Sequence, residues 1–392
     1  MKSNLRKITI MEPTQRRLSS FVLASIVILA CASSPADDGG DRHRATTRYL
    51  QVNLVSDLPG VAALQDTNLV NAWGVSFSSS SPFWVSANGT GLSTLYTVTN
   101  DALGQAHVFK STLEVKIPGA GNVTGQVFNE SAGFHGDLFL FVSEDGTISG
   151  WRPALGTAAE VLTTRPTAVY KGVTLASTLS GLVLLAANFS EGTVDAYDTN
   201  LVLLGRFSDP RAPAGYAPFN VQLAAGHVFV TFAKQDADKE DDVPGPGHGL
   251  IDVFNLQTGR FHRFVTGSDA GGRLHDISSP WGVALAPRSF GRQGDRLLVG
   301  NFGSGTIMAF DADGDFLGLL RNLDGDAIVI HGLWALAFGN GGKAGVPGTL
   351  YFTAGPADET HGLFGSLEPV RVHHEDNDDD DDHDGHGGPG RD

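Results

Sequence analysis

The side chains best suited to chemistry in this sequence are amides, a carboxylate, a lysine and a histidine placed beside short apolar runs. In chain order, these ligand-binding candidates are Asn71, Glu144, Lys171, Asn188, Asn220, Asn301 and His331. Their oxygen and nitrogen atoms could orient a small polar molecule if the fold gathers them at one opening. Asn188 and Asn301 have a second interpretation, because each precedes a turn ending in Gly-Thr, where asparagine often satisfies local backbone groups.

A subset of polar residues has the chemistry of a metal site. Asn220, His331, Asp358 and Glu359 offer oxygen ligands and one imidazole. Oxygen ligands suit a hard cation, so Ca²⁺ is the one cofactor that we consider.

Acid-rich stretches are further candidates. Residues 234–249 contain five acids and two lysines, which predicts either a solvated loop or a lid with a metal site. Asp311-Ala-Asp-Gly-Asp resembles part of a calcium loop but lacks the downstream glutamate, so we interpret it as a hairpin turn. The tail at 370–392 is expected to be disordered and solubilising. Weak capture of divalent metals is the alternative for its histidines, His373, His374, His383 and His386.

Composition excludes several classes of function. The formal net charge of −16 opposes binding to nucleic acid or to an anionic membrane surface. Cys31 is the only cysteine, so a disulfide framework and a cysteine zinc site are excluded. We find no Gly-x-Ser-x-Gly elbow, phosphate-binding glycine loop or His-Glu-x-x-His motif. Simple nucleophilic hydrolysis and nucleotide chemistry therefore have no support.

A repeated unit of about 50 residues must position these groups. In its clearest copy, the apolar runs at 280–285, 295–302, 305–311 and 315–321 indicate four short strands. Trp73, Trp281 and Trp334 recur in the first run of three copies, so we interpret them as core residues rather than a platform for ligand stacking.

Six copies can be traced, and the last one lacks a fourth strand, whereas residues 49–55 form a strand-like run before the first copy. We predict an all-β fold, a six-bladed β-propeller of four-stranded antiparallel blades, closed by strand 49–55 completing the last blade. In such a ring the starts of the inner strands and the hairpins between second and third strands open on one face. We therefore expect the candidate residues to meet at one funnel mouth.

Several motifs resemble known propellers. Asn-Ala-Trp-Gly-Val at 71–75, Pro-Trp-Gly-Val-Ala at 280–284 and the run 300–307 resemble NHL-type blades. Residues 53–57 followed by 68–74 resemble an uncharacterised bacterial family of exported six-bladed propellers, related in architecture to lactonase-like propellers. The resemblance implies the fold and export, and it carries no established activity. Some members of that family end in a Pro-Glu-Pro-type anchor, whereas this chain ends in charged residues.

The N-terminus predicts export. Basic residues precede the apolar run 21–30, and Ala30-Cys31-Ala32 fits a signal-peptidase site. Alternatives are a lipid anchor at Cys31 and a twin-arginine signal at Arg16-Arg17. We expect a signal peptide at 1–32, a disordered linker at 33–48, the propeller at 49–369 and the tail at 370–392. The mature protein would be secreted or periplasmic, with no transmembrane segment.

Two functions from different classes fit these features. The first is a module that binds a small molecule or a protein partner at the funnel mouth, as a ligand-binding or scaffold propeller. The second is a Ca²⁺-dependent hydrolase resembling the lactonase-like propellers, in which a central ion polarises a carbonyl group. Few acids stand at the predicted inner-strand starts, so we rank the enzyme second. We expect a monomer.

Overall fold

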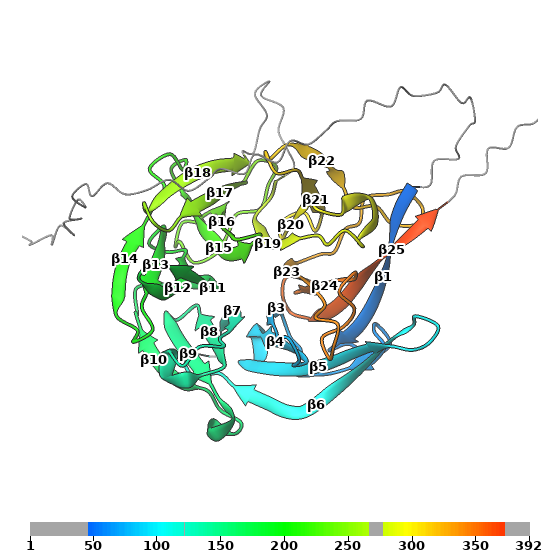
Figure 1. Ribbon diagram of the computed structural model, residues 1–392, viewed down its shortest axis with the longest axis horizontal. Helices are drawn as coiled ribbons and strands as arrows, with labels where there is room; N and C mark the ends of the chain where they lie inside the picture. Colours follow the sequence, from blue (N-terminus) through cyan, green and yellow to red (C-terminus); the bar gives the residue numbers. More distant parts are fainter. Residues whose placement is uncertain (1–45, 121, 266–276, 373–392) are drawn as a thin grey trace, which may run out of the picture. The chain divides into compact units, whose positions relative to one another are not determined.

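The computed structural model describes residues 46–120, 122–265 and 277–372, all within one compact unit, His43–Asp392. Its strands form six sheets arranged in a ring, with β3, β7, β11, β15, β19 and β23 nearest the axis (Figure 1). The predicted six-bladed β-propeller is therefore confirmed. The predicted signal peptide and the four tail histidines lie outside the described residues.

Each of blades one to five is an antiparallel sheet whose four strands follow one another outward. Blade one contains β3 (Ala72–Ser76), β4 (Phe83–Ala87), β5 (Leu92–Asn100) and β6 (Ala106–Lys116). Blade two contains β7 (Val123–Phe128), β8 (Phe139–Ser143), β9 (Thr147–Trp151) and β10 (Glu160–Thr164). Blade three contains β11 (Tyr170–Thr178), β12 (Gly181–Asn188), β13 (Thr193–Tyr197) and β14 (Leu203–Phe207). Blade four contains β15 (Tyr216–Ala224), β16 (His227–Lys234), β17 (Gly249–Asn255) and β18 (Arg260–Val265). Blade five contains β19 (Pro280–Leu285), β20 (Leu297–Asn301), β21 (Ile307–Phe310) and β22 (Phe316–Leu319).

Blade six is built from both ends of the described chain. It contains β23 (Leu333–Phe338), β24 (Leu350–Ala354), β25 (Leu363–Val372), β1 (Thr46–Ser56) and the short parallel strand β2 (Leu64–Gln65). The remaining regular segments are the 3₁₀ turns η1 (Asn88–Thr90), η2 (Phe134–Gly136), η3 (Pro153–Leu155) and η4 (Gly291–Gln293). Across the described ranges, no helix has the length and apolar character needed to cross a membrane.

Strand β1 closes the ring as predicted. It pairs antiparallel with β25, with Gln51 opposite Leu367 and Val52 opposite Ser366. The pairing extends to Thr46 and Val372, beyond the expected limits of 49 and 369. Because β1 fills the fourth position of blade six, no unpaired edge of β25 is left to recruit another chain.

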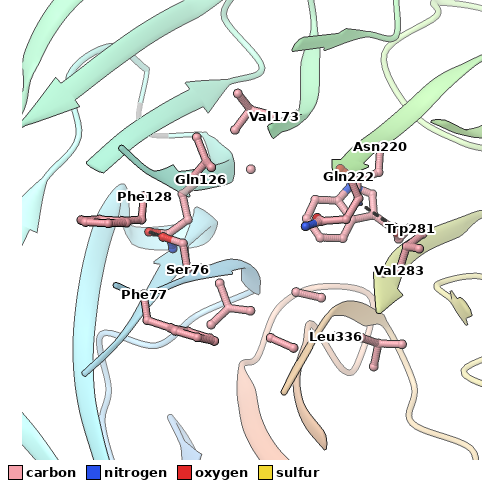
Figure 2. Close-up of a pocket in the computed structure, with 16 residues that line it drawn as sticks. Ser76, Phe77, Gln126, Phe128, Val173, Asn220, Gln222, Trp281, Val283 and Leu336 are labelled. Carbon is pink, nitrogen blue, oxygen red and sulfur yellow. Dashed lines mark hydrogen bonds between the residues drawn. The ribbon is translucent and has the colours of Figure 1, made fainter. Parts of the chain in front are cut away.

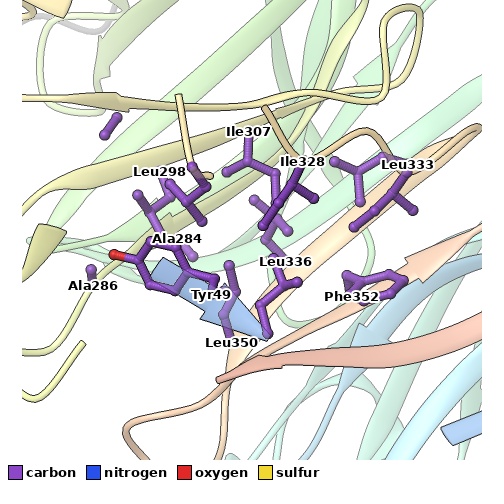
Figure 3. Close-up of a cluster of buried hydrophobic side chains, with 14 of the residues drawn as sticks. Tyr49, Ala284, Ala286, Leu298, Ile307, Ile328, Leu333, Leu336, Leu350 and Phe352 are labelled. Atoms are coloured by element: carbon purple, nitrogen blue, oxygen red, sulfur yellow. The ribbon is translucent and has the colours of Figure 1, made fainter. Parts of the chain in front are cut away.

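The core lies between neighbouring blades, because side chains alternate across each strand. In β21, Ile307 and Ala309 pack toward blade six (Figure 3), whereas Met308 and Phe310 pack toward blade four. Beyond this strand, Asp311 accepts hydrogen bonds from the backbone N–H groups of Asp313 (3.0 Å) and Asp315 (2.9 Å). Its carboxylate therefore stabilises the predicted hairpin turn.

Glycine allows the inner strands to approach one another closely. A Cβ on Gly172 of β11 would lie 2.0 Å from Oδ1 of Asn220 on β15. A Cβ on Gly74 of β3 would lie 2.5 Å from the carbonyl oxygen of Thr124 on β7. No larger side chain fits at these contacts, so glycine here keeps the central channel narrow.

Candidate functional site

The inner strands begin at one face of the ring, which we call the top face. Three of them are preceded by a residue with left-handed backbone geometry: Asn71 (φ 47°), Ser279 (φ 48°) and Gly332 (φ 68°). Each lies two residues before a tryptophan of the repeat. This shared turn leads the chain into the inner strand.

The three repeat tryptophans fill the centre of the ring below the top face. Trp73 stacks on Trp334 with ring centroids 3.7 Å apart, and Trp281 contacts both rings edge-on. All three side chains are buried. They are therefore core residues, in agreement with the interpretation of the sequence. Phe302 stacks on the outer face of Trp334 at 3.9 Å. The aromatic cluster thus forms a floor beneath the top face.

Lys171 is a buried cation at the edge of this floor. Its Nζ forms ion pairs with Glu144 and, at 3.1 Å, with Asp241 of the 234–249 loop. It also lies 5.2 Å from the ring centroid of Trp73. Burial alone would lower the pKa of Lys171, but the two carboxylates outweigh this effect and raise it. Lys171 therefore stays protonated and is unsuited to act as a nucleophile.

Amide side chains connect this ion pair to Glu359. The Nδ2 of Asn88 donates to Glu144 (3.2 Å), and the Nδ2 of Asn71 donates to Asn88 (3.3 Å) and to Glu359 (2.6 Å). The Oδ1 atom of the same Asn71 amide accepts a hydrogen bond from Trp334 Nε1 (3.0 Å). Both ends of the Asn71 amide are thus occupied, which fixes its orientation and that of the Glu359 carboxylate.

The carboxyl group of Glu359, on the top face, has a raised pKa. Burial raises its pKa from 4.5 to about 7, and the Glu144 and Asp241 carboxylates add to this rise. The hydrogen bond from Asn71 and the charge of Lys171 act in the opposite direction. Glu359 therefore changes charge near neutral pH, with a mixture of acid and carboxylate forms.

Glu359 is held in place by a strained turn. Ala357 (φ 55°), Asp358 (φ 51°) and Glu359 (φ 64°) all have left-handed backbone geometry. Such a conformation costs about 1–2 kcal/mol for a residue with a Cβ. Backbone strain of this kind tends to occur where a side chain must be presented in one direction.

A cavity of about 450 Å³ opens beside this turn, and we call it the top-face pocket. Its lining includes Phe302, His331, Asp358 and Glu359, and Pro244 of the 234–249 loop. The loop lies over the predicted face, as expected from its place between β16 and β17. Asp242 of the same loop is largely buried, which raises its pKa to about 6 against the opposing effects of Ser279 and Lys171.

Asn220 does not join the other top-face candidates. Strand β15 begins at Tyr216, because Tyr216 and Ala217 already pair with Lys234 and Ala233 of β16. Asn220 therefore lies within the strand, not at its start, and lines a separate cavity of about 290 Å³ in the central channel (Figure 2). Its Nδ2 donates to the carbonyl oxygen of Trp281 at 2.7 Å.

Asn188 and Asn301 satisfy their own turns. The Nδ2 of Asn188 donates to Glu191 and Asp195, each at 3.1 Å, and that of Asn301 donates to Thr306 Oγ1 at 3.1 Å. These contacts match the turn interpretation rather than the ligand-binding one.

The candidate metal ligands are divided between two cavities. His331, Asp358 and Glu359 line the top-face pocket, and Asn220 lines the channel. Over the residues that the structure describes, no group of three or more His, Cys, Asp or Glu side chains is arranged to hold a metal ion.

The sequence pattern does not single out Asp241, Asp242 or Phe302 as site residues. The density of acids in residues 234–249 was the signal for the first two, but nothing in the sequence indicates which carboxylate reaches Lys171. Phe302 follows the candidate Asn301 directly, and its exposure toward a pocket depends on the packing of Trp334 beneath it.

Comparison with known proteins gives relatives without an assigned activity, and no family model matches the chain. Uncharacterized protein R648 of Acanthamoeba polyphaga mimivirus is 30% identical over 365 residues, covering 86% of this chain and 84% of that protein. Uncharacterized protein L690 of the same virus is 29% identical over 356 residues, covering 84% and 88%. Membership of a bacterial exported family stays a prediction, because these relatives are viral.

Among solved structures, an auxiliary nutrient binding protein from Bacteroides ovatus ATCC 8483 is similar to the chain with a TM-score of 0.51. The two are 12% identical, and the match covers 83% of this chain and 78% of that one. At this identity the likeness shows the propeller fold alone.

Proposed function

We propose that this chain, which belongs to the same family as the uncharacterised mimivirus protein R648, is a ligand-binding module. Because R648 has no assigned activity, the function must be argued from the chain's own site. The module takes a small organic cation in the top-face pocket. The ligand would carry a protonated amine on an apolar body. A volume of about 450 Å³ is in the range of small-molecule sites.

The observation that carries this proposal is the position of Glu359. Glu359 lines the pocket, and the charges of Glu144 and Asp241 are close enough to raise its pKa. Lys171 is the cation among them, and both of these acids already pair with it. The group therefore retains excess negative charge, which an incoming ammonium would neutralise.

The walls of the pocket fit the apolar part of such a ligand. Phe302 offers a ring supported from below by Trp334, and Pro244 adds an apolar edge from the loop. A cation beside an aromatic face gains a further attraction from the ring. The strained turn at 357–359 supports a binding role, since it holds Glu359 in place before any ligand arrives.

The Ca²⁺-dependent hydrolase has weaker support. A central Ca²⁺ needs six to eight oxygen ligands that converge on one point. The candidate ligands lie in two cavities instead, and Glu359 already accepts a hydrogen bond from Asn71. We therefore keep Ca²⁺ as a competitor in the binding experiment rather than as the expected ligand.

Isothermal titration calorimetry on the purified chain tests the proposal with phenethylamine as the probe and CaCl₂ in a parallel titration. The matched variants are Glu359→Gln, which keeps the hydrogen-bond acceptor for Asn71, and Glu130→Gln, which removes an exposed carboxylate elsewhere. Losing a charged hydrogen bond to the amine should weaken binding about 10- to 100-fold in Glu359→Gln. Glu130→Gln should bind as the wild type does.

The pH dependence gives a second criterion. Ionisation of a carboxyl with a pKa of about 7 should raise affinity about tenfold between pH 6 and pH 8. His331 lines the same pocket, so a His331→Gln variant is the control that separates the contribution of this side chain from that of Glu359. Equal affinity of wild type and Glu359→Gln at pH 8, or stoichiometric Ca²⁺ binding that excludes the amine, would overturn the proposal.

We also propose that the protein is exported, as the apolar run at 21–30 and the Ala30-Cys31-Ala32 site indicate. N-terminal sequencing and mass spectrometry of the mature protein test this. A new N-terminus near residue 32, or a lipid on Cys31, is expected. A mature chain that retains its basic N-terminal residues would refute export by this signal.

A further inference from the structure

A groove rich in arginine lies at the face opposite the top-face pocket. It is formed where β25 ends, where β1 begins and where the loop between β19 and β20 passes beside them. Its volume is about 710 Å³, and its lining comprises Thr46, Thr47, Arg288, Ser289, Gly291, Arg292, Pro369, Val370 and Arg371. We call it the arginine groove.

Two of its three arginines lack a carboxylate partner among the described residues. Arg288 pairs with Asp295 at 2.9 Å, but neither Arg292 nor Arg371 forms an ion pair there. Both side chains belong to exposed residues. Because the chain has 43 acidic and only 27 basic residues, we expect each of these two guanidinium groups to form an ion pair with a carboxylate.

The groove is lined by residues of blade five and of blade six, next to the pairing of β25 with β1 that closes the ring. Arg292 belongs to blade five, whereas Arg371 belongs to β25 and pairs in register with Thr47 of β1. The backbone N–H of Arg292 donates to Thr47 Oγ1 at 3.1 Å. An anion bound to both guanidinium groups would therefore connect blades five and six.

The chain itself supplies an acidic segment next to the groove. Residues 375–382 contain seven acids, and three residues separate them from Arg371 in the sequence. Four residues span at most about 14 Å, so Glu375 starts within easy reach of the groove. A tethered segment this close has an effective concentration in the millimolar range, which favours it over a dilute anion of similar chemistry.

We propose that the acidic segment 375–382 binds in the arginine groove, where its carboxylates pair with Arg292 and Arg371. The segment then bridges blades five and six across the closure by β1. This function is independent of ligand binding at the top face, because the groove shares no residue with the top-face pocket.

Fluorescence anisotropy on the full chain tests the proposal with a labelled octapeptide of the sequence 375–382. One variant replaces Asp378–Asp382 by asparagine, another is Arg292→Gln/Arg371→Gln, and a third combines them. Arg260→Gln/Lys343→Gln is the matched control, because it removes two exposed cations elsewhere. At low salt, the asparagine-tail variant should bind the peptide about tenfold more tightly than wild type, since its own segment no longer competes.

Adding Arg292→Gln/Arg371→Gln to the asparagine-tail variant should abolish this binding, whereas adding the control pair should leave it intact. Unchanged circular dichroism spectra establish that each variant is folded. Equal peptide affinity of wild type and the asparagine-tail variant would overturn the proposal, because the segment would then not occupy the groove. Inorganic phosphate that binds the arginines equally well in both proteins would also overturn it, since the groove would be open to external anions.

Discussion

Replacing Glu359 by glutamine should make the protein more stable at pH 8 and leave it unchanged at about pH 3.5. The wild-type carboxyl has a pKa of about 7 in the folded protein, compared with an ordinary value of 4.5. Well below pH 4.5 the group is neutral in both folded and unfolded chains. As the pH rises toward 7, the unfolded chain ionises first, so the wild type loses stability over this range.

The size of the effect follows from the two pKa values. Each factor of ten in proton affinity is worth about 1.4 kcal/mol, so the difference between 4.5 and about 7 corresponds to about 3 kcal/mol. This is an upper limit, because the Glu359 side chain keeps partial contact with solvent. Glutamine carries no charge and can still accept the hydrogen bond from Asn71, so it avoids the penalty without losing the contact.

Urea unfolding at pH values from about 3.5 to 8.5 measures the difference in the free energy of unfolding between wild type and Glu359→Gln. The difference should grow from zero to between 1 and 3 kcal/mol, with most of the change between pH 5 and pH 7.5. Asp242 and Asp252, whose pKa values are also raised to about 6, remain in both proteins and do not affect this comparison directly. A difference independent of pH, or a less stable variant at pH 8, would refute the assigned environment of Glu359.

Three further substitutions test the fold around the site by the same unfolding assay. Ala357→Gly should stabilise the protein by about 1 kcal/mol, because glycine adopts φ 55° without strain; a loss of stability would contradict the left-handed turn. Gly172→Ala should destabilise it by about 1–3 kcal/mol, since the new Cβ would lie 2.0 Å from Asn220 Oδ1; a neutral result would mean that these strands are not in close contact. Tyr49→Ala removes a buried ring stacked on Phe290 at 4.6 Å and should cost about 3–5 kcal/mol. A cost below about 1 kcal/mol would argue against closure of the ring through β1.

The sequence was sufficient to predict the architecture, because the architecture depends on local signals. Each blade repeats short apolar runs separated by turns, and the Asp313-Gly314 pair forms the expected hairpin. The closing strand could be predicted because residues 49–55 form a strand-like run before the first copy and the last copy lacks a fourth strand.

The candidate site could be predicted only in part. Asn71, Glu144 and Lys171 do meet in one hydrogen-bonded group, because the topology places inner-strand starts and second hairpins on the same face. Asn220 was misplaced because the β15–β16 ladder starts earlier than the apolar run suggests. The contact between Asp241 and Lys171 depends on the path of a long loop, and no periodic pattern specifies such a path.

Pairing of Thr46 with Val372 means that the chain enters and leaves the ring at one spot on the rim, opposite the top-face pocket. Any tether through either flank, such as a fusion partner or an immobilising tag, would hold the protein from that side and leave the pocket outward and accessible. Linking the two flanks and cutting the chain in a loop that connects two other blades should likewise yield a permuted protein that keeps every sheet intact.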